Sequence, residues 1–469
     1  MRKSQIFTPL NIAKEMLDAA EYKYNLYGKK VLEDSFGSGN ILMLIVERYI
    51  EDCLREKYNL EDIKKGLEND IYGCEINLHL YNECIKRLND FVIKYNIEEV
   101  NWKFYNTDSL FMNWSIKFDY IIGNPPYIKY HEISISNRLL LKSRFKSCTL
   151  GNFDYYYAFI ENATFLLNSS GKMVYLIPNG VFKNVYANSL REMIKSRIDL
   201  VRAYKNEEIF KGVLVTPVMI RIDNSNNSST LKYQSNKNRK PIEIDKTNLK
   251  NKWIFEEKIS VDDKKRFGDF FSASMSVATL FNDAYILKNL EDIGDFYKSE
   301  GNLFEKEVIK KAASPKSMSI KEENYIIFPY YYQKKKLSRY SVDFFENNFP
   351  NTADYLKKYK WQLDNRSKSK GIQWFEYGRS QALTLIKQPK LLLSTLVTNK
   401  INVYELDEEC IPYSGIFIIP ISDVSLMKAR EILLSNEFKI YVEAIGTQTT
   451  KNSIRITTKD IENYYFTAE

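Results

Sequence analysis

A short turn places an amide, two prolines and an aromatic ring directly after an apolar run. The run ends at Gly123, and Asn124, Pro125, Pro126 and Tyr127 follow. Proline fixes the backbone angle φ and removes an amide donor, so two prolines make a rigid turn whose carbonyl groups face outward. The Asn124 side chain adds an acceptor oxygen, and the Tyr127 ring offers a face for stacking. Such a turn can hold a planar amino group that is attached to a heterocycle.

An amino group of this kind is a poor nucleophile, because its lone pair is delocalised into the ring. Two acceptors that draw its hydrogens out of the ring plane localise the lone pair on the nitrogen. The nitrogen can then attack an electrophilic methyl group in line, and positioning and electrostatics carry such a reaction without a strong base. The alternative is a Pro-rich turn in which Asn124 only caps a backbone group.

Acidic residues stand at the ends of three earlier strand-like segments, at Glu33, Glu75 and Asp108. After Glu33 come Gly37 and Gly39, which let a backbone turn tightly and approach a ligand closely. Glu75 is placed to accept hydrogen bonds from ribose hydroxyls, and Asp108 from an adenine amino group. The alternatives are an ordinary strand-to-helix turn and a helix N-cap. No third glycine follows to bring a pyrophosphate to the helix start, so a nucleoside fits better than a dinucleotide.

The elements that must position these residues alternate between strand-like and helix-like segments. Such alternation predicts an α/β fold, a Rossmann-like parallel sheet with helices on both faces. Functional groups then belong in the loops at the carboxyl ends of the strands. The strands are expected at 29–34, 70–76, 102–110, 118–124, 171–179 and 215–222, and the helices at 40–57, 77–95, 153–167 and 188–197.

A stretch rich in Asn, Ser and Lys, residues 221–240, is typical of a loop or linker. We therefore expect two domains, 1–235 with the cofactor and catalytic residues and 236–469 with a mixed α+β pattern. Residues 301–400 carry 19 Lys and Arg against 9 Asp and Glu, whereas the whole chain has a net charge of +8. This basic excess suggests a polyanion partner, although Lys-rich solvated faces are the alternative.

Composition narrows the class of protein further. The five cysteines are scattered and without CxxC spacing, and there are only two histidines, so we expect reduced thiols and no structural metal site. No stretch approaches the roughly 18 apolar residues of a membrane span, and the first residues lack an apolar signal core. A cytoplasmic protein is expected.

Together these segments resemble the S-adenosylmethionine-dependent adenine-specific DNA methyltransferases. NPPY at 124–127 matches their catalytic motif, VLEDSFGSGN at 31–40 resembles their cofactor loop, and IFTPLNIAKEML at 6–17 resembles their N-terminal motif. The order of these motifs, with a recognition domain last, resembles the gamma class of restriction–modification and orphan methyltransferases. The family usually has Asp-Pro-Ala-Cys before the glycines, where this chain has Glu33, Asp34, Ser35 and Phe36.

The resemblance implies roles for particular residues. Thr8 and Pro9 would border the methionine end of the cofactor, although they also suit simple helix capping. Tyr186 would close over a flipped base, with Phe182 in reserve, and either is alternatively a core residue. The implied catalytic residues are Asn124, Pro125, Pro126, Tyr127 and Tyr186. The implied cofactor-binding residues are Thr8, Pro9, Glu33, Phe36, Gly37, Gly39, Glu75, Ile76, Asp108, Ser109 and Asn124.

The second half resembles the target-recognition region of the same enzymes at 274–287, 326–332, 374–383 and 387–393. Double-stranded DNA is the implied partner, and the resemblance also allows a separate cognate restriction endonuclease. A monomer or weak dimer is expected. The candidate DNA contacts are Lys334, Lys335, Lys336, Arg339 and Arg379, with a solvated loop as the alternative for the lysines.

Two other functions stay open from the sequence. One is an NPPY-type methyltransferase that acts on RNA or on a protein glutamine, whose amide nitrogen is also planar and conjugated. The other is a DNA-binding module with a degenerate cofactor site, which the altered loop before Gly37 favours.

Overall fold

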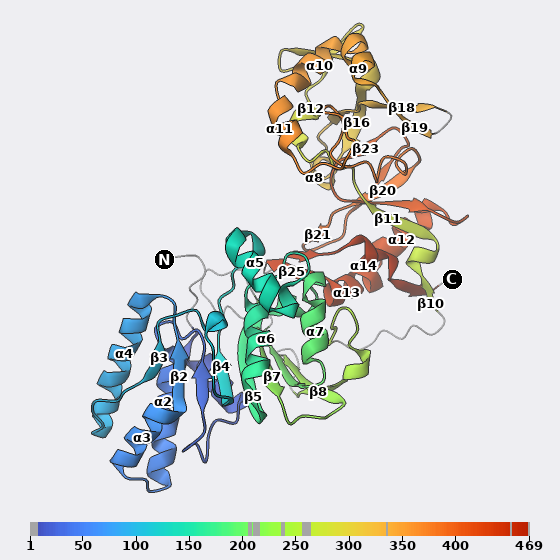
Figure 1. Cartoon of the computed structure of the whole chain (residues 1–469). Helices are drawn as coiled ribbons and strands as arrows, with labels where there is room; N and C mark the ends of the chain where they lie inside the picture. Colours follow the sequence, from blue (N-terminus) through green and yellow to red (C-terminus); the bar gives the residue numbers. More distant parts are fainter. Residues whose placement is uncertain are drawn as a thin grey trace. The chain divides into compact units, whose positions relative to one another are not determined.

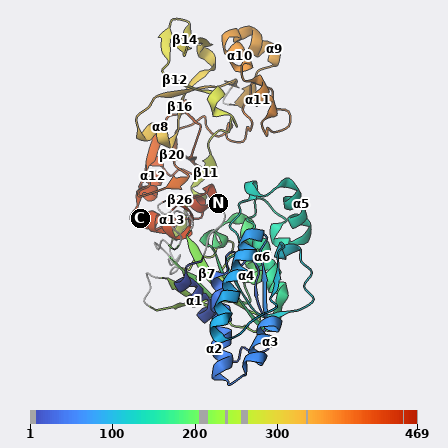
Figure 2. The ribbon, with the colours of Figure 1, turned by 90° about the vertical axis from the view of Figure 1, so that its left-hand side faces the viewer.

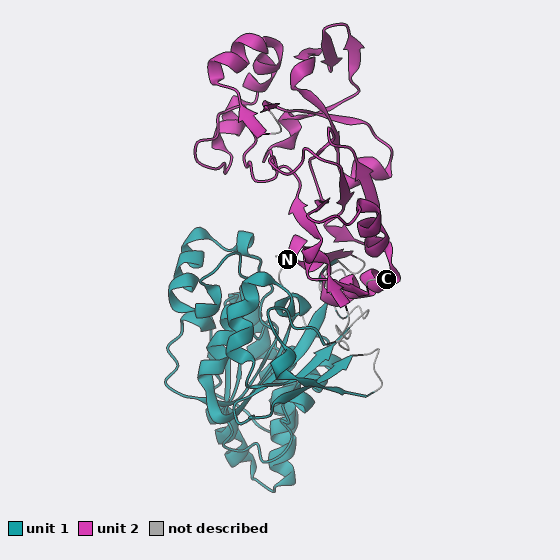
Figure 3. Cartoon of the chain, turned by 90° about the vertical axis from the view of Figure 1, so that its right-hand side faces the viewer, with its two compact units in different colours: residues 1–256, 447–451 teal, residues 257–446, 452–469 magenta. Residues whose placement is uncertain are grey.

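The computed structural model describes residues 8–204, 209, 216–235, 240–255, 264–333, 336–450 and 453–467. The chain forms two compact units, here called the first unit (residues 1–256 and 447–451) and the second unit (257–446 and 452–469) (Figure 3). The division predicted after residue 235 falls between β8 (Thr230–Ser235) and β9 (Ile242–Asp245). These two strands pair antiparallel, which keeps the chain in the first unit beyond that point.

A nine-stranded sheet forms the centre of the first unit, in the order β3-β2-β1-β4-β5-β7-β6-β8-β9. The first five of these strands run parallel, and β7 lies antiparallel between β5 and β6. The predicted α/β class with a Rossmann-like sheet is therefore confirmed, and β7 makes the sheet mixed. The other strands are β1 (Val31–Glu33), β2 (Ile71–Cys74), β3 (Lys103–Tyr105), β4 (Phe118–Gly123), β5 (Leu167–Pro178), β6 (Ile198–Ala203) and β7 (Pro217–Asp223).

Helices cover both faces of this sheet (Figures 1 and 2). Successive strand residues point to opposite faces, and so Ile121 and Ile122 of β4 belong to two separate hydrophobic clusters. The first four helices pack in the cluster of Ile122, and the next three in the cluster of Ile121. The helices are α1 (Leu10–Ala19), α2 (Asn40–Arg55), α3 (Leu60–Asp70), α4 (Leu78–Val92), α5 (Ile135–Arg144), α6 (Tyr156–Leu166) and α7 (Asn188–Ile194).

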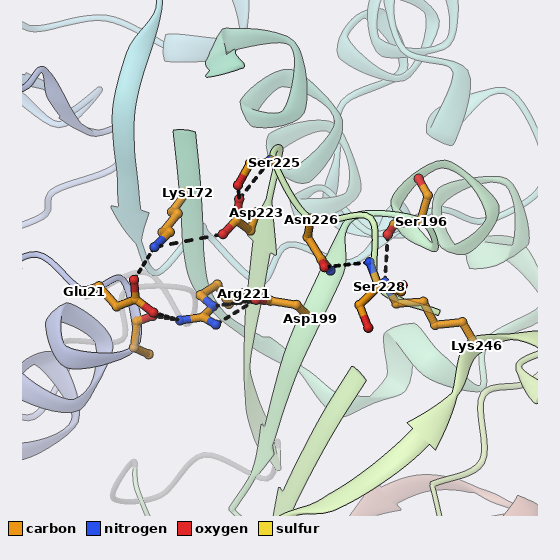
Figure 4. A network of polar contacts seen from close by, with 11 residues as sticks. Glu21, Lys172, Ser196, Asp199, Arg221, Asp223, Ser225, Asn226, Ser228 and Lys246 are labelled. Carbon is orange, nitrogen blue, oxygen red and sulfur yellow. Dashed lines mark hydrogen bonds and ion pairs between the residues drawn. The ribbon is translucent and has the colours of Figure 1, made fainter. Parts of the chain in front are cut away.

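A network of ion pairs joins the end of α1 to β5, β6 and β7 (Figure 4). Arg221 lies 2.9 Å from Glu21 and 2.7 Å from Asp199, and Lys172 contacts both Glu21 and Asp223. The hydrogen bond from Lys172 and the charge of Arg221 hold the pKa of Glu21 below its ordinary value. Lys172 pairs in register with the start of β4, so the network lies toward the amino ends of the parallel strands. The network therefore does not occupy the carboxyl ends of the parallel strands, where a ligand site can form.

The second unit is built from small sheets and short helices, as the predicted mixed α+β class requires. Aromatic rings dominate its core, where Phe345 and Phe375 stack at 4.1 Å and Tyr285 meets Tyr377 edge-on. Its helices are α8 (Pro315–Ser319), α9 (Val342–Asn348), α10 (Pro350–Lys357), α11 (Lys360–Asn365), α12 (Leu426–Leu434), α13 (Asn436–Ile445) and α14 (Thr458–Glu462).

Among the described residues, the remaining strands pair mostly antiparallel, and β16 pairs parallel with β23. They are β10 (Lys264–Arg266), β11 (Phe271–Met275), β12 (Ile286–Lys288), β13 (Glu291–Ile293), β14 (Phe296–Ser299), β15 (Asn302–Glu305), β16 (Ile309–Ala313), β17 (Asn324–Ile327), β18 (Tyr330–Gln333), β19 (Lys336–Arg339), β20 (Lys390–Leu393), β21 (Leu396–Val397), β22 (Val403–Leu406), β23 (Ile411–Pro412), β24 (Ile416–Pro420), β25 (Thr447–Thr450), β26 (Ser453–Arg455) and β27 (Tyr465–Thr467).

Candidate active site

A cavity of about 870 Å³ opens at the carboxyl ends of β1, β2, β3 and β4. Parallel strands bring the residues that follow them to one edge of the sheet, which is where a ligand crevice forms in this kind of fold. Among the described residues, the lining does not include Pro9, Gly39, Pro125, Tyr127 or Tyr186. The predicted site residues that do line it are Thr8, Glu33, Phe36, Gly37, Glu75, Ile76, Asp108, Ser109, Asn124 and Pro126.

The glycine loop between β1 and α2 depends on backbone conformations that favour glycine. Gly37 has φ of 57° and Gly39 has φ of 84°. A Cβ atom at Gly39 would lie only 2.3 Å from Sγ of Cys84 on α4. The Gly39 N–H donates to the Phe36 carbonyl at 2.8 Å, which closes the turn before α2 begins. Gly39 therefore shapes the loop from behind, whereas Gly37 belongs to the cavity wall.

Glu75 fixes the glycine loop from the neighbouring strand. One carboxylate oxygen accepts the Gly37 N–H at 2.9 Å, and the other accepts the Asn77 N–H at 2.8 Å. A carboxylate has about four acceptor positions, so these two bonds leave capacity for a ligand hydroxyl. The predicted cofactor residue is thus also the residue that holds the loop in place.

Asp108 lines the cavity and is also the N-cap that the sequence offered as the alternative to a ligand contact. Its Oδ1 accepts the Leu110 N–H at 3.0 Å and caps the 3₁₀ turn Ser109–Phe111. Its Oδ2 accepts the Tyr155 hydroxyl at 2.6 Å. Burial, with the negative charge of Asp108, raises the pKa of Tyr155 and keeps this hydroxyl a donor. Asp108 lines the cavity together with Tyr155, which sequence reasoning did not single out.

Side-chain contacts join the three predicted motifs at the NPPY turn. Nδ2 of Asn124 donates to Oγ1 of Thr8 at 3.2 Å, and the Thr8 carbonyl accepts from Asn40 at 3.0 Å. The Ser35 hydroxyl lies 3.5 Å from the Asn124 carbonyl. The N-terminal motif, the cofactor loop and the NPPY turn, far apart in the chain, therefore form one polar corner of the cavity.

Tyr127 is anchored to the sheet by its hydroxyl, which donates to the Leu176 carbonyl on β5 at 3.1 Å. Its ring meets Tyr156 edge-on at 6.2 Å. Burial raises the pKa of Tyr127, so the hydroxyl stays protonated. The ring is fixed in orientation, and its stacking on a heterocycle stays a prediction.

The two aromatic candidates after β5 lie in different surroundings. Phe182 is 1% exposed and packs between Trp253 and Phe255, with ring centres 5.8 and 4.8 Å away, so it is a core residue. Tyr186 is 39% exposed, and its ring lies directly on Gly151, where a Cβ would come within 2.0 Å of it. Only Tyr186 has a surface that a ligand can reach.

Asp34 is the residue that sequence reasoning undervalued. It is 3% exposed, lines the cavity, and accepts the Tyr175 hydroxyl through Oδ2. Burial raises the pKa of Asp34 to about 7, and that of Glu33 well above its ordinary value. Within the described part of the chain, Oδ1 of Asp34 and Oε2 of Glu33 have no hydrogen-bond partner. The only sequence signal for Asp34 was an acidic residue at the position where the resembled family has proline.

These buried acceptors test whether the wall fits the expected cofactor. An unpaired acceptor in a buried wall is costly unless a ligand supplies a donor or a positive charge. S-adenosylmethionine carries hydroxyl and amino donors and a positive sulfur, so the acidic lining formed by Glu33, Asp34, Glu75 and Asp108 fits it. The described residues hold no group of three or more His, Cys, Asp or Glu arranged for a metal ion.

The predicted DNA contacts in the second unit differ in their surroundings. Arg339 forms two bonds, of 2.6 and 2.5 Å, to Glu376, which is fully buried. Lys336 and Arg379 are exposed, and the Arg379 backbone bridges to Ala278. Lys334 and Lys335 lie outside the described residues. Across the described helices, none is long and apolar enough to cross a membrane.

The sequence of this chain is similar to restriction–modification proteins over the first unit and beyond it. Residues 16–210 match the family described as Eco57I restriction-modification methylase. The Type II methyltransferase M.BstVI of Geobacillus stearothermophilus is 30% identical over 202 residues, covering 40% of this chain and 36% of that protein. The Type II restriction enzyme and methyltransferase RM.Eco57I of Escherichia coli is 20% identical over 327 residues, covering 60% and 33%. The chain spans about a third of the length of these relatives.

The fold is shared with a solved restriction-modification enzyme. The Type IIL restriction-modification enzyme MmeI, determined in complex with DNA, has a TM-score of 0.61 and 13% identity, over 97% of this chain and 64% of that chain. At this identity the likeness shows a common fold. The region that matches restriction-modification methylases thus contains Glu33, Glu75, Asp108 and Asn124, the residues that this fold brings to the cavity.

Proposed function

We propose that this chain transfers a methyl group from S-adenosylmethionine to the exocyclic amino group of adenine in double-stranded DNA. The observation that carries this proposal is the polar corner at Asn124, where Thr8 and Ser35 meet the NPPY turn in the wall of one acidic cavity. The motif order supports the gamma class, and the similarity of residues 16–210 supports a restriction–modification or orphan methylase.

The residues divide the work between cofactor and base. Glu75, Asp108 and the loop at Gly37 would hold the cofactor, and Thr8 would border its methionine end. When bound, S-adenosylmethionine supplies an electrophilic methyl group on a positively charged sulfur. The Asn124 side-chain oxygen and the backbone carbonyl of the next residue would accept the two hydrogens of the adenine amino group. This orients the nitrogen lone pair, and preorganised acceptors of this kind act without a strong base.

The adenine must leave the duplex to reach the cavity. Flipping a base costs a few kcal/mol, which stacking on Tyr127 and the contacts to the amino group would offset. We assign the second unit to target recognition, because residues 301–400 carry the basic excess and Arg379 is exposed. The DNA in the MmeI structure belongs to that protein and supports the assignment only as an analogy.

Radiolabelled S-adenosylmethionine, unmethylated genomic DNA and the purified chain at low salt test this proposal. The DNA is digested to nucleosides, and we expect the label in N6-methyladenine, at one short sequence motif. Label in RNA or in a protein glutamine would show that DNA is not the substrate, and the assignment as a methyltransferase would stand. If nothing is labelled and equilibrium dialysis detects no cofactor binding, the chain is a DNA-binding module with a degenerate site.

A further inference from the structure

Helix α5 follows the NPPY turn in the first unit (Figure 1). Its N-terminal end lies in the cavity wall, and its outer face carries exposed side chains. Ser134, its N-cap, and Asn137 in its first turn line the cavity, and Leu141 is fully buried beneath it. On the outer face, Ile135 is 74% exposed and Leu139 is 65% exposed. These two apolar side chains stand one helical turn apart beside the rim of the cavity, and most of the surface of each is exposed.

Two cations share that outer face. Arg138 lies over the Tyr130 ring at 4.3 Å from its centre, and Lys142 lies over the same ring at 5.6 Å. In the part of the chain that the structure describes, neither takes part in an ion pair. No acidic residue occurs from Ile135 to Lys146, whereas four basic residues do. The face therefore presents preorganised, uncompensated positive charge next to exposed apolar surface.

We propose that the outer face of α5, defined by Ile135, Arg138, Leu139 and Lys142, contacts the DNA duplex beside the flipped base. The cations complement backbone phosphates, whose neutralisation dominates DNA affinity. Exposed Ile and Leu side chains are the wedges that proteins insert at an opened base step. The assignment rests on the proposed function, since it takes duplex DNA as the substrate of the cavity that α5 borders. A second copy of the chain is the rival occupant.

The phosphate contacts are tested by the double variant Arg138→Gln/Lys142→Gln. The matched control is Lys23→Gln/Lys94→Gln, because these exposed lysines also lie over aromatic rings and do not line the cavity. Binding to a fluorescent duplex of mixed sequence is followed by anisotropy over a range of salt. We expect about tenfold weaker binding and a salt slope reduced by about two, near 0.9 for each lost phosphate contact. The control should match the wild type.

The apolar contact is tested by Ile135→Ser/Leu139→Ser, with the exposed pair Leu54→Ser/Leu78→Ser as control. Methyl transfer to unmethylated plasmid DNA should fall at least about tenfold in the α5 variant, because the opened base step loses its wedge. Cofactor affinity and the melting temperature should not change. Duplex affinity should change less than in the charge variant.

The outcomes separate this contact from the proposed function. If the wild type binds duplex and methylates DNA but both α5 variants behave like their controls, the contact is wrong and the proposed function stands. If the wild type transfers labelled methyl groups only to RNA or protein, the proposed function is wrong. If the charge variant then also binds duplex DNA as tightly as the wild type, the proposed contact at α5 is wrong as well. If Ile135→Ser/Leu139→Ser changes the molecular mass measured in solution but leaves DNA methylation unchanged, the outer face of α5 packs against a second copy of the chain.

Discussion

At the scale of single residues, Asn124 is the sharpest test of the chemistry. Asn124→Ala removes the acceptor oxygen and the bond to Thr8 but no other part of the acidic lining. We expect methyl transfer to fall at least about a hundredfold, the usual loss when one preorganised group at a reacting centre is removed. Cofactor affinity, measured by calorimetry, should stay within a few-fold of the wild type. Loss of cofactor binding would instead count against the assignment of Asn124 to the adenine amino group.

Asp34 predicts a pH-dependent stability. Burial raises its pKa from the ordinary 3.8 to about 7 in the folded protein. The stability contributed by the protonated acid is complete below pH 3.8 and is lost as the pH rises through about 7. Asp34→Asn removes this dependence. The difference in melting temperature, variant minus wild type, should therefore become more positive as the pH rises from about 5 to about 8. The full linkage amounts to a few kcal/mol.

The control for this experiment is the exposed substitution Asp90→Asn, which should shift the melting temperature little and equally at both values of pH. A gain by Asp34→Asn that does not depend on pH would mean that the carboxyl is already ionised in the folded protein. A carboxyl that is ionised in the folded protein is already stabilised by its surroundings. Such a result would therefore weaken the argument that Asp34 needs a donor or a positive charge from a ligand.

Residues that line the cavity could be predicted because their types and spacing are local. Asn124, Glu75 and Asp108 each follow a strand, and parallel strands bring such positions together. Their partners could not be predicted, since Tyr175 meets Asp34 across 141 residues and Tyr155 meets Asp108 across 47. Whether a carboxyl stays unpaired depends on packing, which no short motif records.

At the scale of elements, the turn before α2 predicts a steric test. Gly39→Ala would place a Cβ 2.3 Å from Sγ of Cys84 at a φ of 84°. We expect the free energy of unfolding to fall by about 2–4 kcal/mol, from backbone strain and overpacking together. Because the loop carries Gly37 and is held by Glu75, cofactor affinity should fall too. Thermal melting and calorimetry measure the two effects.

Gly28→Ala is the matched control, because Gly28 has φ of 77° but nothing within 4 Å of the added Cβ. It should cost only the backbone strain, about 1 kcal/mol, and leave cofactor binding unchanged. Adding Cys84→Ala to Gly39→Ala should restore part of the lost stability, since it opens the space that the new methyl group needs. Equal losses of unfolding free energy in Gly39→Ala and Gly28→Ala would show that the contact between the new Cβ and Cys84 on α4 does not destabilise the protein.

Long, strongly patterned elements of the first unit could be predicted, and short ones could not. The strands and helices expected from residue 29 to residue 124 appear close to their predicted places. Helix α3 was missed because its core contact comes from only Ile63 and Leu67 among apolar side chains. Helix α5 was missed because its apolar residues are mostly exposed, so they form no core-facing stripe.

At the scale of the whole molecule, charge predicts which half of the chain carries the target-recognition surface but not which side chains form it. Composition places the basic excess at 301–400, in the second unit. Which cations are available depends on their acidic neighbours, and Arg339 is held by the buried Glu376 while Arg379 is exposed. Two residues that were both candidate DNA contacts in the sequence therefore separate into a structural and a binding candidate.

This difference gives the last prediction. Arg339→Ala leaves the Glu376 carboxylate buried without its cation, and we expect the free energy of unfolding to fall by about 1–3 kcal/mol. The value lies below that of a fully buried pair, because Arg339 itself is half exposed. Arg379→Ala should leave the melting temperature unchanged and weaken binding to the duplex. Thermal melting and anisotropy, run on both variants, should give opposite patterns. If Arg379→Ala binds duplex as the wild type does at every salt concentration, the recognition surface of the second unit lies on other side chains.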